Sequence, residues 1–236
     1  HPDLLVELGD DHVATIVIDR GPDNYIDVEL AAGIADALER FEGDIACRAI
    51  VLASNGKHFC AGARLSRAAD DLPTGDSNPL YAEVARMFTG SVPIVAVVQG
   101  AAIGAGLGLA LAADFRVAGP DARFGATFAR LGFHQGFGLS ATLPRAVGEQ
   151  RALEMLYTGK RVKADEALAI RDDVGFFQAV RAQLAKGNAD VTRSDEELDH
   201  AIRQIISRAV VADGVVDIFT AAGLKRPDIS ILSDEF

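Results

Sequence analysis

The feature that most constrains this chain is a glycine-rich turn between a short apolar strand and an apolar helix, in the stretch PIVAVVQGAAIGAGLGLALAADFRVA, residues 93–118. Its first part is rich in β-branched residues and is typical of a strand buried on both faces. A second run of the same kind, RAIVLAS at residues 48–54, leads into another turn, NGKHFCAGARL. Helical segments between and after these runs predict strand–helix–strand alternation, and therefore an α/β fold with a largely parallel sheet covered by helices.

The remaining elements follow from turn and cap signals. Residues 4–8 and 13–19 read as two strands joined by GDDH, and Asp27 is a plausible N-cap for a helix that Gly43 would end. We expect a further helix over 80–89 and a third strand over 115–118, with a loop over 72–79. From Gly138 onward no strand is predicted, and SDEE at 194–197 is a capping box before a helical pattern that runs to 209.

Composition and charge exclude several classes of partner. The 236 residues carry a formal net charge of −11, which argues against nucleic acid or an anionic membrane as the main partner. The longest apolar run, residues 107–113, is far shorter than the roughly 20 residues of a membrane-spanning helix. Cys47 and Cys60 are the two cysteines, no metal-ligand cluster is visible around them, and we expect a reducing, cytoplasmic setting.

The glycines at 104, 106 and 108 do not match the G-x-G-x-x-G spacing of a dinucleotide site. Glycines directly before a helix expose unpaired N–H groups at its positive end, where they stabilise a negative oxygen. The turn FCAGARL follows the neighbouring strand, so the amides of Ala63 and Ala105 are expected to come together as a two-donor oxyanion site. Tight packing of a helix on a sheet through small residues is the alternative explanation.

Three segments, taken in their order and spacing, resemble the crotonase superfamily, which is the enoyl-CoA hydratase/isomerase group. They are GKHFCAGARL, PIVAVVQGAAIGAGLGLALAADFRVA and ARFGATFARLGF. The resemblance implies a spiral of ββα units with a helical C-terminal region. It implies a core over 1–159 and a helical region over 160–236 for trimerisation or as a lid. The implied assembly is a homotrimer or a hexamer built as a dimer of trimers.

The resemblance also assigns the site. Ala63 and Ala105 would be the backbone oxyanion donors toward the thioester carbonyl of an acyl-CoA substrate, and no separate bound cofactor or metal is implied. Binding of the coenzyme A moiety falls to a set of residues near the two turns: Asn24, Tyr25, Ile26, Ala61, Ala63 and Arg64.

The sequence departs from the family at the proton-transfer positions. Relatives carry catalytic glutamates where this chain has Gly108 and Phe128, and an alternative aspartate would fall near Gly136 or Phe137. None of these four side chains transfers a proton, so ordinary hydratase chemistry through carboxylates does not fit.

Polar residues near these positions are the remaining candidates. His134 is a candidate acid/base because its ordinary pKa suits proton transfer near neutrality, and Gln135 is a candidate for orienting water or a carbonyl. A surface loop is the alternative for both. His58 is interpreted as a loop residue near the nucleotide, Cys60 as a small buried residue, and Asp114 as structural. Arg64 and Arg67 could meet coenzyme A phosphates or a solvated surface equally well.

The sequence therefore predicts an enzyme of the lyase, isomerase or hydrolase type that acts on an acyl-CoA thioester, in fatty acid metabolism. The alternative is a non-catalytic acyl-CoA-binding protein that kept the binding site and lost the carboxylates. A dinucleotide oxidoreductase is a third, weaker hypothesis.

Overall fold

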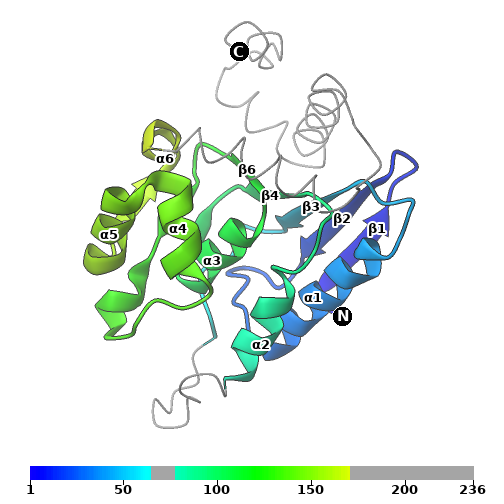
Figure 1. Ribbon diagram of the computed structural model, residues 1–236, viewed down its shortest axis with the longest axis horizontal. Coiled ribbons are helices and arrows are strands. Elements are labelled where there is room, and N and C mark those ends of the chain that lie inside the picture. Colours follow the sequence, from blue (N-terminus) through cyan, green and yellow to red (C-terminus); the bar gives the residue numbers. More distant parts are fainter. Residues whose placement is uncertain (65–77, 171–236) are drawn as a thin grey trace, which may run out of the picture. The chain divides into compact units, whose positions relative to one another are not determined.

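The computed structural model describes residues 1–64 and 78–170, which all belong to the first of the two units, His1–Ala189 and Asp190–Phe236, into which the chain divides. Within that part, one sheet has five strands in the order β1-β2-β3-β4-β6, and a second has three in the order β5-β7-β8 (Figure 1). The predicted α/β class is confirmed. The predicted loop at 72–77, Arg67, and the capping box and helix at 194–209 lie outside the described residues.

The first sheet begins with the predicted hairpin. Strands β1 (Leu4–Leu8) and β2 (Val13–Ile18) pair antiparallel, with Leu4 opposite Ile18 and Leu8 opposite Ala14. Strand β3 (Ala49–Ser54) then joins β2 in parallel, which requires the helical crossover that the sequence places between them.

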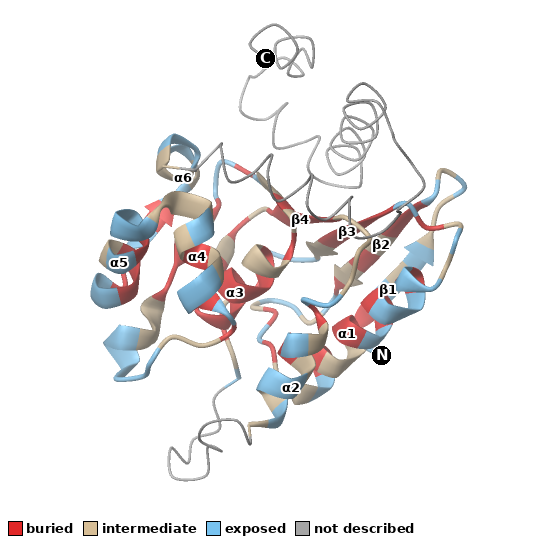
Figure 2. Cartoon of the chain, viewed as in Figure 1, coloured by how far each residue is buried: buried red, intermediate tan, exposed pale blue. Residues whose placement is uncertain are grey.

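Parallel pairing continues across the sheet through β4 (Ile94–Val98) and β6 (Phe115–Ala118). All five residues of β4 and the first four of β3 are buried, as predicted for strands covered on both faces (Figure 2). Asp114 accepts a hydrogen bond from the Ile94 amide at 2.8 Å, which confirms the structural role expected for this carboxylate.

Two helices that contact each other, α1 (Val28–Glu42) and α2 (Pro79–Arg86), precede β3 and β4. The predicted caps of α1 are confirmed: Asp27 Oδ1 accepts the Leu30 N–H at 3.0 Å, and Gly43 is the C-cap. Helix α2 ends at Arg86, before the predicted Thr89, and Arg86 ties it to α1 with 2.6 Å ion pairs to Asp36 and Glu39. The buried face of α1 has the period of a helix that packs on a sheet: Leu30, Ala31, Ile34, Ala35, Ala37, Leu38 and Phe41.

The second sheet consists of three-residue strands, β5 (Ala101–Ile103), β7 (Arg123–Gly125) and β8 (Arg161–Lys163). Strand β8 contradicts the expectation that no strand follows Gly138. It pairs antiparallel with β7, yet only its middle residue, Val162, is buried between two exposed cationic residues. So short a pattern carries no detectable period, and the pairing depends on a partner that is distant in sequence.

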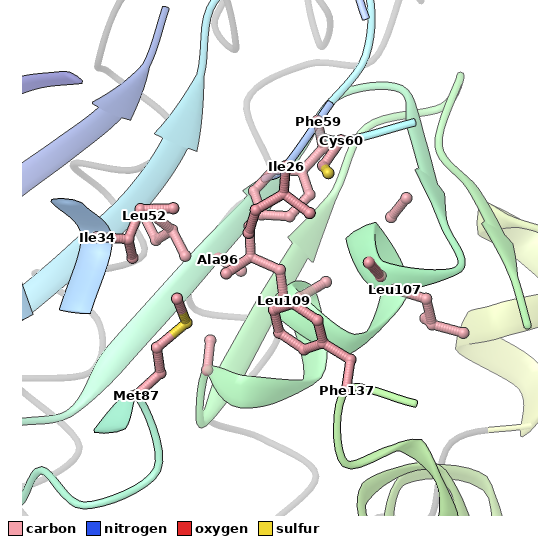
Figure 3. Packing of buried hydrophobic residues seen from close by; sticks show 14 of the residues in the cluster. Ile26, Ile34, Leu52, Phe59, Cys60, Met87, Ala96, Leu107, Leu109 and Phe137 are labelled. Carbon is pink, nitrogen blue, oxygen red and sulfur yellow. The ribbon is translucent and has the colours of Figure 1, made fainter. Parts of the chain in front are cut away.

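The segment after β5 is helical in most of its length: α3 (Ala105–Ala112), the 3-10 helix η3 (Thr127–Leu131), α4 (Leu139–Val147), α5 (Glu149–Thr158) and α6 (Ala164–Ile170). Helix α3 is buried on nearly every side, and it contacts α4, β5 and β6. Its Leu107 and Leu109 belong to a core cluster that also includes Ile26, Phe59 and Phe137 (Figure 3). None of the helices in 1–64 and 78–170 is long and apolar enough to cross a lipid bilayer.

Candidate active site

The first of the two expected amides, that of Ala63, lies beside Ile26 in a parallel bridge. In such a bridge one residue makes both hydrogen bonds, and here it is Ile26, whose N–H donates to Gly62 O at 2.9 Å and whose carbonyl accepts from the Arg64 N–H at 2.7 Å. The Ala63 N–H is therefore left outside the bridge. No described residue accepts a hydrogen bond from it.

The second amide, that of Ala105, is the first N–H of helix α3. Gly104 turns the chain with a φ of +57°, a left-handed conformation that favours glycine, and its own N–H donates to Gly125 O at 2.8 Å. The first residue of a helix has no intrahelical acceptor, so the Ala105 N–H points out of the positive end of α3. It too has no acceptor among residues 1–64 and 78–170.

The two turns lie side by side because a bridge aligns Cys60 with Ala102 in parallel. The Cys60 N–H donates to Ala101 O at 3.0 Å, and the Cys60 carbonyl accepts from the Ile103 N–H at 3.1 Å. Counted from this aligned pair, Ala63 and Ala105 are each three residues further along, at the same end of the two segments. Both unpaired amides therefore belong to adjacent turns at one level of the fold.

Close packing keeps the two turns together. A methyl group built at Gly106 would lie 2.8 Å from the carbonyl carbon of Cys60, so the first turn of α3 rests on the main chain of the neighbouring turn. Small-residue packing and unpaired amides were alternative explanations of the glycines, and both features are present. The packing at Gly106 brings the amide of Ala105 next to the turn that carries Ala63.

The residues assigned to coenzyme A surround the same turn. The Asn24 side chain is fully buried: it donates to the carbonyls of Asn55 at 2.8 Å and His58 at 2.7 Å and accepts from the Arg20 N–H at 3.0 Å. The Ala61 N–H donates to Asp23 O at 2.9 Å, and Ile26 is buried. The exposed side chains of this set are those of Tyr25 and Arg64.

An ion-pair cluster that the sequence analysis missed fixes this region. Arg20 donates from Nη1 to Asp27 Oδ2 at 2.5 Å and from Nε to Asp3 Oδ2 at 2.6 Å, and Arg64 Nη1 lies 3.7 Å from the same Asp27 oxygen. Burial alone would raise the pKa of Asp27, but the hydrogen bonds from Arg20 and Leu30 and the charges of both arginines outweigh it and hold that pKa below its ordinary value. Asp27 directly follows Ile26, so the cluster also holds the residue that orients the Ala63 amide. No sequence signal pairs Arg20 with its partners.

Phenylalanine side chains border Gly108 and Gly104, next to positions at which the family resemblance leads us to expect carboxylates. A methyl group built at Gly108 would lie 2.5 Å from Cβ of Phe137 and 2.7 Å from its ring, so Phe137 fills the space of a side chain at 108. Phe137 is 2% exposed and points into the core cluster (Figure 3). Phe128 lies at the other end of the turn, with its ring 3.8 Å from a methyl group built at Gly104. The contact between Phe137 and Gly108 was not predicted, because no periodicity relates the two positions.

The polar side chains considered as candidates near these positions differ in burial and in hydrogen-bond partner. His134 is exposed, and its Nδ1 lies 2.9 Å from the carbonyl of Gln135, which is half-buried. His58 Nδ1 accepts a hydrogen bond from the Ala101 N–H at 3.3 Å. Cys60 is fully buried, and burial raises its pKa to about 11, so its thiol is protonated and inert at neutral pH. In the described ranges, no three His, Cys, Asp or Glu side chains form a group that could hold a metal ion.

Comparisons with known proteins find relatives of one family. A family model described as enoyl-CoA hydratase/isomerase matches residues 9–206. A Mycobacterium tuberculosis protein named probable enoyl-CoA hydratase is 42% identical over 247 residues, which cover 96% of this chain and 92% of that protein. The fatty acid oxidation complex subunit alpha of Pseudomonas aeruginosa is 33% identical over 178 residues, 71% of this chain and 24% of the longer protein. A crystal structure of an enoyl-CoA hydratase/isomerase from Pseudoalteromonas atlantica superposes with a TM-score of 0.65 at 28% identity, over 93% of this chain and 90% of that one.

Proposed function

Because the chain belongs to the enoyl-CoA hydratase/isomerase family and has the crotonase fold, we propose that it is an enzyme that uses the amides of Ala63 and Ala105 to activate an acyl-CoA thioester. The observation that carries the proposal is that these two amides, at the same level of two aligned turns, donate to no described residue. Ala105 is buried and Ala63 is half-buried, and main-chain N–H groups shielded from water without a partner are rare in folded proteins. A substrate oxygen between the two would satisfy both.

The proposed chemistry starts at the thioester carbonyl. Two N–H donors, one at the positive end of helix α3, stabilise the negative charge that develops on the carbonyl oxygen as an enolate or a tetrahedral intermediate forms. One such donor is typically worth about 2.7–4 kcal/mol in the transition state. Because the donors are main-chain groups, their position depends on the turns and on the Cys60–Ala102 bridge that aligns them.

The coenzyme A moiety is proposed to lie along the segment of Asn24, Tyr25 and Ile26 and the turn from Ala61 to Arg64. The exposed guanidinium of Arg64 suits a phosphate, and the exposed ring of Tyr25 suits the apolar parts of the cofactor moiety. The Asn24 side chain makes its hydrogen bonds within the protein, so this residue would contribute through its main chain. No metal or second cofactor is part of the proposal.

The reaction that follows is not a hydration through two carboxylates, since Gly108 and Phe128 stand at those positions. Isomerisation, decarboxylation, C–C hydrolysis or a hydration that uses other groups all start from the same stabilised oxyanion. His134 and Gln135 remain the proposed proton-transfer and orienting candidates. Unchanged turnover in a His134→Ala variant would show that the histidine has no role in the reaction.

Replacement of Ala105 by proline tests the proposed oxyanion site. Proline is favoured at the first position of a helix, and the Ala105 N–H has no described acceptor, so Ala105→Pro deletes the donor without breaking a described main-chain hydrogen bond. With butyryl-CoA labelled with ¹³C at the carbonyl, we expect the NMR signal of the bound carbonyl to move downfield in the parent protein and much less in the variant. Glu149→Pro is the matched control: it opens α5 after a positive-φ glycine, as Ala105 opens α3.

If the carbonyl signal of bound butyryl-CoA is the same in the parent protein and in folded Ala105→Pro, the oxyanion proposal is wrong. The alternative is a non-catalytic acyl-CoA-binding protein. The observation that supports it is the absence of a carboxylate at residues 108, 128, 136 and 137. A panel of acyl-CoA thioesters decides between the two: turnover of any member supports the enzyme, whereas binding by calorimetry without any turnover supports the binding protein.

A further inference from the structure

The loop of Gly136, Phe137 and Gly138 is held against the first turns of α3 in a way that the proposed chemistry does not require. Phe137 has a φ of +57°, which is uncommon for a bulky residue, and Gly138 follows with a φ of +71°. The backbone therefore adopts two successive left-handed conformations, which place the Phe137 ring over Gly108. Such conformations persist only where their surroundings impose them, so contacts with other elements must hold this loop.

Two aromatic side chains of one segment pack on it, at the glycines that precede and follow Phe137 in the sequence. A methyl group built at Gly136 would lie 2.9 Å from Cζ of Tyr81, the second residue after the start of α2. A methyl group built at Gly138 would lie 3.2 Å from Cζ of Phe88, in the turn that follows α2. Both rings therefore come from α2 and the turn directly after it. The glycines at 136 and 138 thus let the two rings pack directly on the loop.

Phe137 and any side chain at 108 compete for one space. Gly108 is three residues after Ala105, so the two positions share a face of α3 and the space above Gly108 borders the helix end that carries the proposed donor. Phe128 borders the same end from the side of Gly104. An acyl group whose carbonyl oxygen meets the Ala105 amide would therefore meet aromatic carbon on both sides.

We propose that Phe137 determines the acyl specificity of this site: held over Gly108 by Tyr81 and Phe88, it admits acyl groups that are apolar and unbranched next to the thioester and excludes branched ones. This inference rests on the proposed function, because it assumes that an acyl-CoA thioester binds at the Ala105 amide. It predicts that, without the Phe137 ring, the site binds a wider range of acyl groups and still binds the thioester.

Calorimetric binding of butyryl-CoA and of branched pivaloyl-CoA tests the specificity. We expect the parent protein to prefer butyryl-CoA by about tenfold or more, the scale on which a pocket rejects surplus methyl groups. In Phe137→Gly, which also relieves the positive φ, the preference should fall to near equality. Phe41→Ala, which removes an equally buried ring from α1, is the matched control and should keep the parent preference.

A second measurement does not depend on the ligand. In the parent protein, Gly108→Ala places a methyl group against Phe137 and should lower the unfolding midpoint. In the Phe137→Gly background the same change should raise the midpoint, because alanine then gains its better helix propensity without a clash. In the Phe41→Ala background it should still lower the midpoint. If Phe137→Gly does not fold, Phe137→Ala serves in its place.

The outcomes separate the two proposals. If neither thioester binds to the parent protein, the proposed function fails and the specificity proposal falls with it. If both bind but the preference is the same in the parent protein and in the Phe137 variant, Phe137 does not determine specificity while the family-level function stands. If Gly108→Ala lowers the midpoint equally in every background, Phe137 does not occupy the space over Gly108, and the inference is overturned.

Discussion

At the scale of single residues, the buried amide of Asn24 shows how one side chain can hold two loops together. Its side chain reaches carbonyls that are 31 and 34 residues further along the chain, and its φ of +51° is one that asparagine tolerates better than most residues. The family resemblance places Asn24 near the coenzyme A moiety. Its contacts could not be predicted from the sequence, because they depend on which loops the fold brings together.

Replacement of Asn24 by alanine leaves the Asn55 carbonyl and the Arg20 main-chain N–H without their partner, whereas the His58 carbonyl keeps its hydrogen bond from the Ser54 hydroxyl. We expect Asn24→Ala to lower the free energy of unfolding by about 2–4 kcal/mol, since each unsatisfied buried group costs about 1–3 kcal/mol. Urea denaturation measures the change. Asn55→Ala is the control, because that side chain is exposed and it should change stability by less than about 0.5 kcal/mol. Equal, small effects of both changes would contradict the structural role of Asn24.

At the scale of elements, helix α1 could be predicted well because its signals are local. The Asp27 cap, the apolar period and Gly43 all lie within or beside the helix, and the structure confirms each of them. The ion pair between Asp27 and Arg20 is not local to the helix and was not predicted. It couples the start of α1 to the hairpin through Asp3, and to the site through the adjacent Ile26.

The Asp27 carboxylate makes stability depend on pH in a defined direction. Its pKa is lowered in the folded protein, so its contribution is fully present above the ordinary value of 3.8 and is lost as pH falls below it through the lowered pKa. Asp27→Asn keeps a good N-cap but loses the ion pair, so we expect a loss of about 1–3 kcal/mol at pH 7.

Denaturation at several pH values between neutrality and pH 3 measures this dependence. The stability difference between the parent protein and Asp27→Asn should shrink as pH falls. Asp10→Asn, in the exposed hairpin turn, is the control and should follow the parent curve. A difference for Asp27→Asn that stays constant down to pH 3 would contradict a charge-dependent contribution.

At the scale of the whole molecule, the sequence could predict the alternation of strands and helices and the meeting of the two turns. Runs of β-branched residues indicate buried parallel strands, and turns that follow adjacent parallel strands lie at the same edge of the sheet. The sequence could not predict β8, whose three residues have one buried member, or the contact between Phe137 and Gly108, which depends on where α2 holds a loop. The sequence shows Gly108 and Phe128 where the resemblance leads us to expect carboxylates, but it does not show that Phe137 fills the space over Gly108.

Assembly into a trimer or hexamer stays a prediction. Large apolar side chains that are exposed on the described part of the chain include Ile45 at 88%, Tyr157 at 73% and Leu131 at 59%. Burial of such side chains against other copies would stabilise an assembly. Light scattering after size-exclusion chromatography should give three or six times the chain mass, and it should keep that value on tenfold dilution. A mass of one chain at every concentration would contradict the prediction.

The measurement that tests the central proposal most directly is a crystal structure with butyryl-CoA bound. We expect the thioester carbonyl oxygen to lie about 2.7–3.1 Å from the amide nitrogens of both Ala63 and Ala105, with the acyl chain between the rings of Phe128 and Phe137. A thioester oxygen bound away from these two nitrogens, or either amide donating to another protein group in the complex, would contradict the proposal.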